Sequence, residues 1–199
     1  MTMARDLTAE AMTDEDLLVL YADGDPAAAR TLVLRLSPRV LGFAARLLGG
    51  DRAEAEDVAQ EALLRLWRAA PGWRTGEAKV STWLYRVVSN LATDRLRARG
   101  RRRQDGLDDA PEVADDSPGA VAQLIETDRQ AALTRALAAL PDRQREAVVL
   151  RHLEGLSNPE IGAVLGVGVE AVESLVARGK RALASALAGQ RDGLGYEGD

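Results

Sequence analysis

Apolar and small residues recur at helical spacing through most of the chain. Between residues 55 and 70 such positions repeat every three or four residues, which places them on one face of a helix. They are Ala55, Val58, Ala59, Ala62, Leu63, Leu66, Trp67 and Ala70. The pattern predicts an amphipathic helix with one buried face.

Capping residues predict where helices begin in the first part of the chain. Thr13 precedes three acids, and acids stabilise the positive end of a helix dipole, so a helix is expected to start there. Asp25-Pro26 and Ser37-Pro38 each place a capping residue before a proline. Both dipeptides predict a further helix start.

Helix breakers predict the remaining boundaries of this part. Gly49-Gly50 predicts the end of one helix, and Asp51 predicts the start of the next. Pro71-Gly72 predicts the end of the amphipathic helix. A polar loop over residues 73–79 then leads into another helix.

The segment from Ser81 to Arg103 is strongly basic. From residue 83 onward it carries seven arginines against one acid, in a chain of net charge -5. One side of a helix here would carry Trp83, Arg86, Asn90, Asp94, Arg97 and Arg101, and the other Leu84, Val87, Val88 and Leu91. Arginines neutralise phosphates, while tryptophan and asparagine suit bases. The pattern predicts a nucleic-acid face, and a solvated basic helix end is the alternative.

Residues 104–120 differ sharply in composition from the helices around them. This stretch holds six acids, two prolines, two glycines and no basic residue. Such a composition is typical of a flexible linker. The acids also suit a tether that lies against the preceding arginines until another polyanion replaces it, although a plain spacer explains them equally well.

The C-terminal part predicts a helix-turn-helix. Helices are expected over residues 121–140 and 142–153, divided at Pro141. Ser157 and Glu160 have the spacing of a capping box, and Gly166 predicts the end of a short helix. A longer helix is expected from residue 169. The two helices suit DNA binding or a plain helical hairpin.

Composition narrows the class of protein. Hydrophobic residues make up 46% of the 199 residues and aromatics 4%, which favours helices. The absence of cysteine and the single histidine, His152, exclude disulfides and thiolate or histidine metal sites, and no cofactor is expected. No signal-peptide core or long apolar segment is present, so we expect a soluble, cytoplasmic protein without membrane insertion.

Together these patterns predict an all-α protein with two small helical domains joined by an acidic flexible linker. The expected ranges are 12–103 for the first domain, 104–120 for the linker and 121–188 for the second. The second domain contains the helix-turn-helix.

Three segments in this order resemble bacterial RNA polymerase sigma factors of the extracytoplasmic-function (ECF) group. AEAEDVAQEALLRLWRA is similar to the helix that docks on the polymerase clamp helices. STWLYRVVSNLATDRLR resembles the promoter-melting segment, and GLSNPEIGAVLGVGVEAVESLVARGKRAL resembles the C-terminal helix-turn-helix. The resemblance implies core RNA polymerase, promoter DNA and an anti-sigma factor as partners, and no enzymatic activity.

The resemblance assigns the first of these helices to polymerase binding. The implied contact residues are Asp57, Gln60, Glu61 and Leu64. They lie opposite the apolar stripe, and acids beside an exposed leucine suit a basic partner with an apolar spot. A solvated acidic face is the alternative.

The resemblance assigns minus-ten recognition to the loop and the basic helix. The loop over 73–79 would hold a flipped-out base, and Arg86, Asn90 and Arg97 would contact the adjoining duplex and its phosphates. From their positions in the loop and on the basic side of the helix, Trp73, Trp83 and Arg101 are expected as further DNA contacts. Aromatics beside cations also suit unstacked bases on physical grounds.

The predicted recognition helix departs from the family pattern. The family commonly has a serine, a lysine, an arginine and a histidine or arginine where this chain has Gly168, Glu173, Leu175 and Ala177. The expected DNA contacts of this helix are Glu170, Glu173, Ser174, Arg178 and Arg181. Because acids repel phosphate but accept from the cytosine amino group, we expect an unusual minus-thirty-five preference or weaker duplex affinity.

Two other functions fit parts of the sequence. A stand-alone helix-turn-helix regulator would bind duplex DNA without polymerase, but it leaves the acidic amphipathic helix without a role. A metal-dependent hydrolase could use Glu54, Asp57 and Glu61, which share a helix face. Such a site usually needs carboxylates from a second helix as well, so this function is the weakest of the three.

Overall fold

The computed structural model describes residues 12–76, 78–104 and 121–188, which form helices without any β-strand. The all-α prediction is confirmed. In chain order the helices are α2 (Asp14–Ala22), α3 (Pro26–Leu47), α4 (Arg52–Ala69), the short 3₁₀ helix η1 (Ala70–Gly72), α5 (Val80–Gln104), α6 (Val121–Ala138), α7 (Asp142–His152), α8 (Asn158–Leu165) and α9 (Val169–Ala188).

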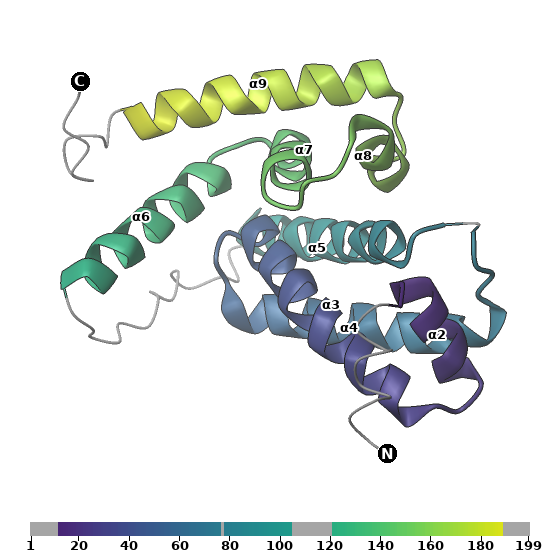
Figure 1. Ribbon diagram of the computed structural model, residues 1–199. Helices are drawn as coiled ribbons and strands as arrows, with labels where there is room; N and C mark the ends of the chain where they lie inside the picture. Colours follow the sequence, from purple (N-terminus) through teal and green to yellow (C-terminus); the bar gives the residue numbers. More distant parts are fainter. Residues whose placement is uncertain (1–11, 77, 105–120, 189–199) are drawn as a thin grey trace.

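The helices form two halves that pack on each other. Helices α2–α5 make the N-terminal half, and α6–α9 make the C-terminal half (Figure 1). Helices α7 and α8 lie between α9 and α5, so α9 is on the side of the molecule away from the N-terminal half. Most of the buried apolar residues of both halves belong to one continuous cluster.

The predicted helix starts at Thr13, Asp25 and Asp51 are confirmed. Each of these side chains accepts a hydrogen bond from a backbone N–H in the first turn of the helix that follows. Such bonds satisfy N–H groups that have no partner within the helix. The caps therefore set where α2, α3 and α4 begin.

The prediction of a helix start at Ser37-Pro38 is wrong, because α3 continues through Pro38. Proline removes one backbone donor, and its ring opposes the carbonyl of Leu34 one turn earlier. The buried stripe of α3 is nevertheless unbroken across it, from Leu32 through Leu36 and Val40. Burial of that stripe outweighs the local cost, and Pro38 itself is exposed.

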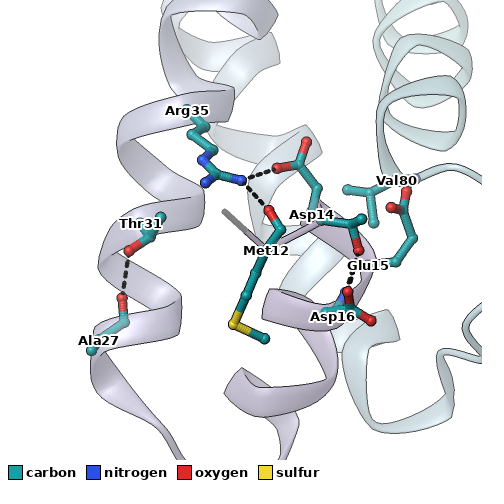
Figure 2. Close-up of polar contacts among 9 residues, drawn as sticks. Met12, Asp14, Glu15, Asp16, Ala27, Thr31, Arg35 and Val80 are labelled. Carbon is teal, nitrogen blue, oxygen red and sulfur yellow. Dashed lines mark hydrogen bonds and ion pairs between the residues drawn. The ribbon is translucent and has the colours of Figure 1, made fainter. Parts of the chain in front are cut away.

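Two polar contacts join α2 to its neighbours (Figure 2). The Glu15 carboxylate accepts from the backbone N–H of Val80 at 2.6 Å, so a side chain from α2 caps the start of α5. Arg35 of α3 donates to the Met12 carbonyl at 2.8 Å and to the Asp14 carboxylate at 3.2 Å. These contacts fix the start of the basic helix against α2.

The C-terminal half contains the predicted helix-turn-helix. The Glu160 carboxylate accepts from the backbone N–H and hydroxyl of Ser157, which confirms the capping box at the start of α8. Gly166 follows α8 with φ of 67°, a conformation that favours glycine, and α9 begins three residues later. The two helices are thus joined by a tight turn.

The predicted acidic linker lies outside the described residues, apart from Gln104, which is the last residue of α5. Within the described part of the chain, no helix is long and apolar enough to span a bilayer.

Candidate protein and nucleic-acid interfaces

The outer face of α4 is open to solvent. Asp57, Gln60 and Leu64 are exposed and Glu61 is half-buried, while Val58 and Leu66 on the opposite side are buried. Leu64 keeps 43% of its surface accessible and supplies apolar area to this otherwise polar face. The structure brings the four predicted polymerase contacts onto one face.

Arginines neighbour the acids of this face. The Glu61 carboxylate accepts from Arg65 Nε at 2.8 Å, and this bond lowers the pKa of Glu61. An Asp57 oxygen lies 3.8 Å from Arg95 of α5. The lowered pKa favours the ionised form of Glu61, which lies one turn from Leu64 on the same face.

The exposed side of α5 carries the predicted nucleic-acid groups. Arg86, Asn90, Arg97 and Arg101 are exposed along the helix, whereas Leu84 and Val88 are buried on the opposite side. The helical spacing of the sequence thus assigned these residues to the correct sides, whereas Trp83, also expected on the basic side, is half-buried. A strip of cations beside one amide is able to contact phosphates and bases.

Trp73 and Trp83 are less accessible than expected. Both are half-buried against the apolar core, and their rings meet edge to face with centroids 5.9 Å apart. The indole N–H of Trp73 is buried, and no hydrogen-bond partner lies near it in the part of the chain that the structure describes. The two rings brace the loop before α5.

Sequence reasoning missed two arginines that join α5 to α4. Arg95 contacts Glu54, and Arg99 donates to Asp51 at 2.6 Å. They line a hollow of about 340 Å³ together with Ala98 and Arg102. The only sequence signal was the spacing of Arg95 and Arg99, one helical turn apart and off the predicted nucleic-acid side.

The helix-turn-helix presents one exposed face of α9. The predicted DNA contacts are all exposed, namely Glu170, Glu173, Ser174, Arg178 and Arg181. Val172 is fully buried and fixes the rotation of the helix. Glu173 accepts from the Asn158 side chain at 3.5 Å, so α8 holds one of the acids in place.

The acids proposed as metal ligands have cationic neighbours. Glu54 contacts Arg95, Asp57 lies near the same guanidinium, and Glu61 is bonded to Arg65. Among the described residues, no three histidine, cysteine or acidic side chains have a grouping that could hold a metal ion.

Two family models match the chain. The model for sigma-70 region 2 matches residues 32–102, which include α4 and most of α5. The model for sigma-70 region 4 matches residues 130–183, which include the helix-turn-helix. Together the matches cover more than half of the sequence.

The chain is also similar to curated sigma factors. It is 38% identical to the ECF RNA polymerase sigma factor SigE of Mycolicibacterium smegmatis over 85% of this chain and 66% of that protein, slightly less than two thirds of its length. It is 34% identical to the RNA polymerase sigma-H factor of Pseudomonas aeruginosa, over 87% of this chain and 93% of that protein. It is 32% identical to the ECF RNA polymerase sigma-E factor of Escherichia coli K12, over 87% of this chain and 94% of that protein.

Two solved structures share the fold. RpoE in complex with the anti-sigma factor NepR from Bartonella quintana has a TM-score of 0.67 and 26% identity, over 80% of this chain and 96% of that one. CnrH in complex with the cytosolic domain of CnrY has a TM-score of 0.64 and 28% identity, over 88% of this chain and 97% of that one.

Proposed function

The chain belongs to the ECF group of RNA polymerase sigma factors, and we propose how its faces divide the work of that group. ECF sigma factors bind core RNA polymerase and direct initiation at particular promoters. In this proposal α4 docks on polymerase, α5 and its preceding loop bind the minus-ten element, and α9 binds the minus-thirty-five element. The corresponding domains are residues 12–103 and 121–188.

The observation that carries the docking assignment is the exposed Leu64 on the same face of α4 as the acids Asp57 and Glu61. Leucine supplies apolar area at the centre of a contact, and Asp57 and Glu61 supply charge at its edge. The complementary partner surface is basic with an apolar spot. The face has no fold-stabilising role comparable to the buried stripe opposite it.

Run-off transcription with bacterial core RNA polymerase tests this assignment. Changing Asp57→Lys reverses a charge that is exposed, so the fold should persist while polymerase-dependent initiation falls at least about tenfold. The matched control is Glu56→Lys, an exposed glutamate on the flank of the same helix, whose initiation should stay near the wild-type level. Wild-type initiation by the folded Asp57→Lys variant would refute the docking face.

The basic side of α5 supports binding of a melted strand. Arg86, Arg97 and Arg101 would contact phosphates, and Asn90 would contact the adjoining duplex. Trp73 and Trp83 would support a flipped-out base from the loop through their partly exposed rings.

The charge of α9 suggests an unusual minus-thirty-five preference. Arg178 and Arg181 would hold the backbone, while Glu170 and Glu173 near the start of the helix would accept from cytosine amino groups. Start sites mapped in the same transcription experiment on a genomic promoter library would reveal that element. Duplex binding without any polymerase-dependent initiation would favour a stand-alone regulator instead.

The structural neighbours support regulation by an anti-sigma factor. RpoE of Bartonella quintana was solved in complex with the anti-sigma factor NepR, and CnrH was solved in complex with the cytosolic domain of CnrY. We include an anti-sigma factor among the partners of this chain on that ground.

A further inference from the structure

The last turns of α5 carry arginines on two opposite sides. Arg97 and Arg101 lie on the proposed nucleic-acid side. Arg95, Arg99 and Arg102 are separated by four and three residues, so they lie within about 60° of one another on roughly the opposite side of the helix. Earlier in α5 this opposite side is the buried stripe that contains Leu84 and Val88. Cations therefore replace apolar residues on this side where the helix ends.

These three arginines line the hollow between the end of α5 and the start of α4. Its volume is about 340 Å³, and its other lining residues are Glu54 and Ala98. The two helices are antiparallel, so α4 begins where α5 ends (Figure 1). The lining contains three cations and one acid, which gives the hollow an excess of positive charge. Its size is at the lower end of the range for small-ligand sites, roughly 300 to 1,000 Å³, and admits a phosphate group.

Acids of α4 orient two of the guanidiniums. The Asp51 carboxylate accepts from Arg99 Nη2 at 2.6 Å, and the Glu54 carboxylate accepts from Arg95 Nη1. Each of these bonds uses one terminal nitrogen, whereas a guanidinium has five N–H donors. A braced arginine therefore keeps donors for a second acceptor. Because its side chain is already ordered, binding that acceptor costs less conformational entropy.

The carboxylate of Asp51 is itself fixed on the backbone. Its Oδ1 accepts from the backbone N–H of Glu54 and caps α4, while its Oδ2 accepts from Arg99. The Arg99 side chain nevertheless remains 31% exposed. Helix α4 begins beside Arg99, and Arg102 on the next turn of α5 is exposed. Both arginines are thus accessible to a ligand from solvent.

The two basic sides of α5 match the two backbones that border a groove of duplex DNA. An α-helix with its side chains is about 10 to 12 Å across, and the major groove is about 12 Å wide. A helix end placed in that groove turns its opposite sides toward the two phosphate backbones. Arg97 and Arg101 would then meet one strand, and Arg99 and Arg102 would meet its complement.

We propose that the hollow between α4 and α5 is a phosphate-binding site for the second strand of the promoter duplex, the complement of the strand held by Arg97 and Arg101. This inference rests on the proposed binding of promoter DNA by α5 and adds a second line of contact to it. The ligand is a backbone phosphodiester, which Arg99 and Arg102 contact. Arg95 stays with Glu54 and contributes positive charge. Such a site adds affinity and fixes the register of the duplex without reading its sequence.

The salt dependence of DNA binding tests the site. The full-length chain is assembled with core RNA polymerase, and binding of a promoter recovered by run-off transcription is measured by fluorescence anisotropy at several salt concentrations. Arg99→Gln and Arg102→Gln should each weaken binding about tenfold and lower the slope of log affinity against log salt by about one. Arg102→Lys retains the charge and should retain the slope. Unchanged affinity and slope in both glutamine variants would overturn the proposal.

Arg52→Gln is the matched control. Arg52 neighbours Asp51 and its side chain is 85% exposed, but it is not among the residues that line the hollow. Affinity and slope should therefore stay at the wild-type values. An equal loss in this variant would overturn the site, because overall charge would then explain the effect. Arg102→Gln keeps the test decisive if loss of the bond to Asp51 unfolds Arg99→Gln, and circular dichroism monitors the fold of each variant.

Single methylphosphonates identify the strand that each arginine contacts. This neutral group replaces one phosphate at a time along either strand of the promoter. Where an arginine meets that phosphate, the two changes together should cost no more than one of them, so their effects are non-additive. Arg99→Gln and Arg102→Gln should be non-additive with positions on one strand. Arg97→Gln and Arg101→Gln should be non-additive with positions on the other.

The pattern of non-additivity separates this site from the proposed function. If Arg97 and Arg101 match one strand while Arg99 and Arg102 match the same strand or none, the second-strand site is overturned and the role of α5 stands. If Arg97 and Arg101 match no phosphate on either strand, the proposed nucleic-acid side of α5 is refuted, and the two-strand arrangement with it.

Discussion

Glu146 shows how burial and hydrogen bonding compete at a single carboxylate. Burial raises the pKa of Glu146, and hydrogen bonds from Ser89 and Thr93 and the charge of Arg143 only partly offset it. The net shift is upward, so the ionised form is disfavoured at this position. At neutral pH the burial of this carboxylate therefore opposes the packing of α7 on α5, while its hydrogen bonds to Ser89 and Thr93 favour it.

We predict that Glu146→Gln stabilises the protein at neutral pH by about 1 kcal/mol, because the amide avoids burying a charge. A group with a raised pKa stabilises the folded state most when it is protonated. The advantage of the variant should shrink as pH falls through the raised pKa and disappear below about 4.5. Urea unfolding of both proteins from pH 4 to 8 measures it, and a destabilised variant at pH 7 would contradict the prediction.

Glu160 behaves in the opposite way. Hydrogen bonds from Lys79 and Ser157 lower its pKa to about 2. Its favourable contribution is complete above the ordinary value of 4.5 and is lost only as pH falls from there to about 2. Mild acidification therefore acts on Glu146 and leaves the contact between the loop and the helix-turn-helix unchanged.

At the scale of the element, α7 and α9 approach each other at a glycine. A Cβ on Gly179 would lie 2.5 Å from a Val148 methyl and 3.0 Å from the Gln144 carbonyl. Because the Gln144 carbonyl belongs to the backbone of α7, a side chain at position 179 would fit only if α7 or α9 shifted. Gly179 thus permits the packing that orients the proposed recognition helix.

We predict that Gly179→Ala destabilises the chain by about 1 to 2 kcal/mol, although alanine favours helix, because overpacking costs more than the propensity gains. Gly100→Ala is the matched control, since a Cβ there meets nothing within 4 Å. It should stabilise α5 by about 0.5 to 1 kcal/mol. Thermal unfolding of both variants measures these changes. Similar shifts of the midpoint temperature in the same direction for Gly179→Ala and Gly100→Ala would contradict the close approach of α7 and α9.

At the scale of the whole molecule, the halves share one buried cluster and a set of polar contacts. Shared burial couples their unfolding, because separation of the halves would expose apolar area and leave Glu146 and Arg145 without partners from the N-terminal half. The chain should therefore unfold as one cooperative unit.

We predict coincident unfolding transitions when different probes are used. All three tryptophans, Trp67, Trp73 and Trp83, belong to the N-terminal half, so their fluorescence monitors that half, while circular dichroism monitors all helices. The two transitions should coincide in urea for the wild type. They should separate in Arg46→Glu, which replaces the ion pair between Arg46 and Glu154, at 3.1 Å across the two halves, with two like charges. Separate transitions in the wild type would show that the halves fold independently.

The sequence by itself determined the helices, most of their ends and the faces exposed on α4, α5 and α9. These features depend on local information: apolar periodicity, caps such as Thr13 and Gly166, and charge on the side opposite a buried stripe. Pro38 is the exception, because the apolar periodicity of α3 continues past it. Burial of that stripe outweighed the local preference of Ser37-Pro38 for a helix start.

Only the tertiary structure decided which polar residues are buried and with what. Arg145 and Glu146 precede an apolar run, and their positions are equally typical of the solvated first turn of a helix. The neighbouring sequence does not indicate that Leu47 and Ser89 are their partners. Trp83 likewise lies on the basic side by periodicity yet packs on Trp73. Contacts between distant segments depend on the shapes of two folded surfaces, and a linear pattern of residues does not contain that shape.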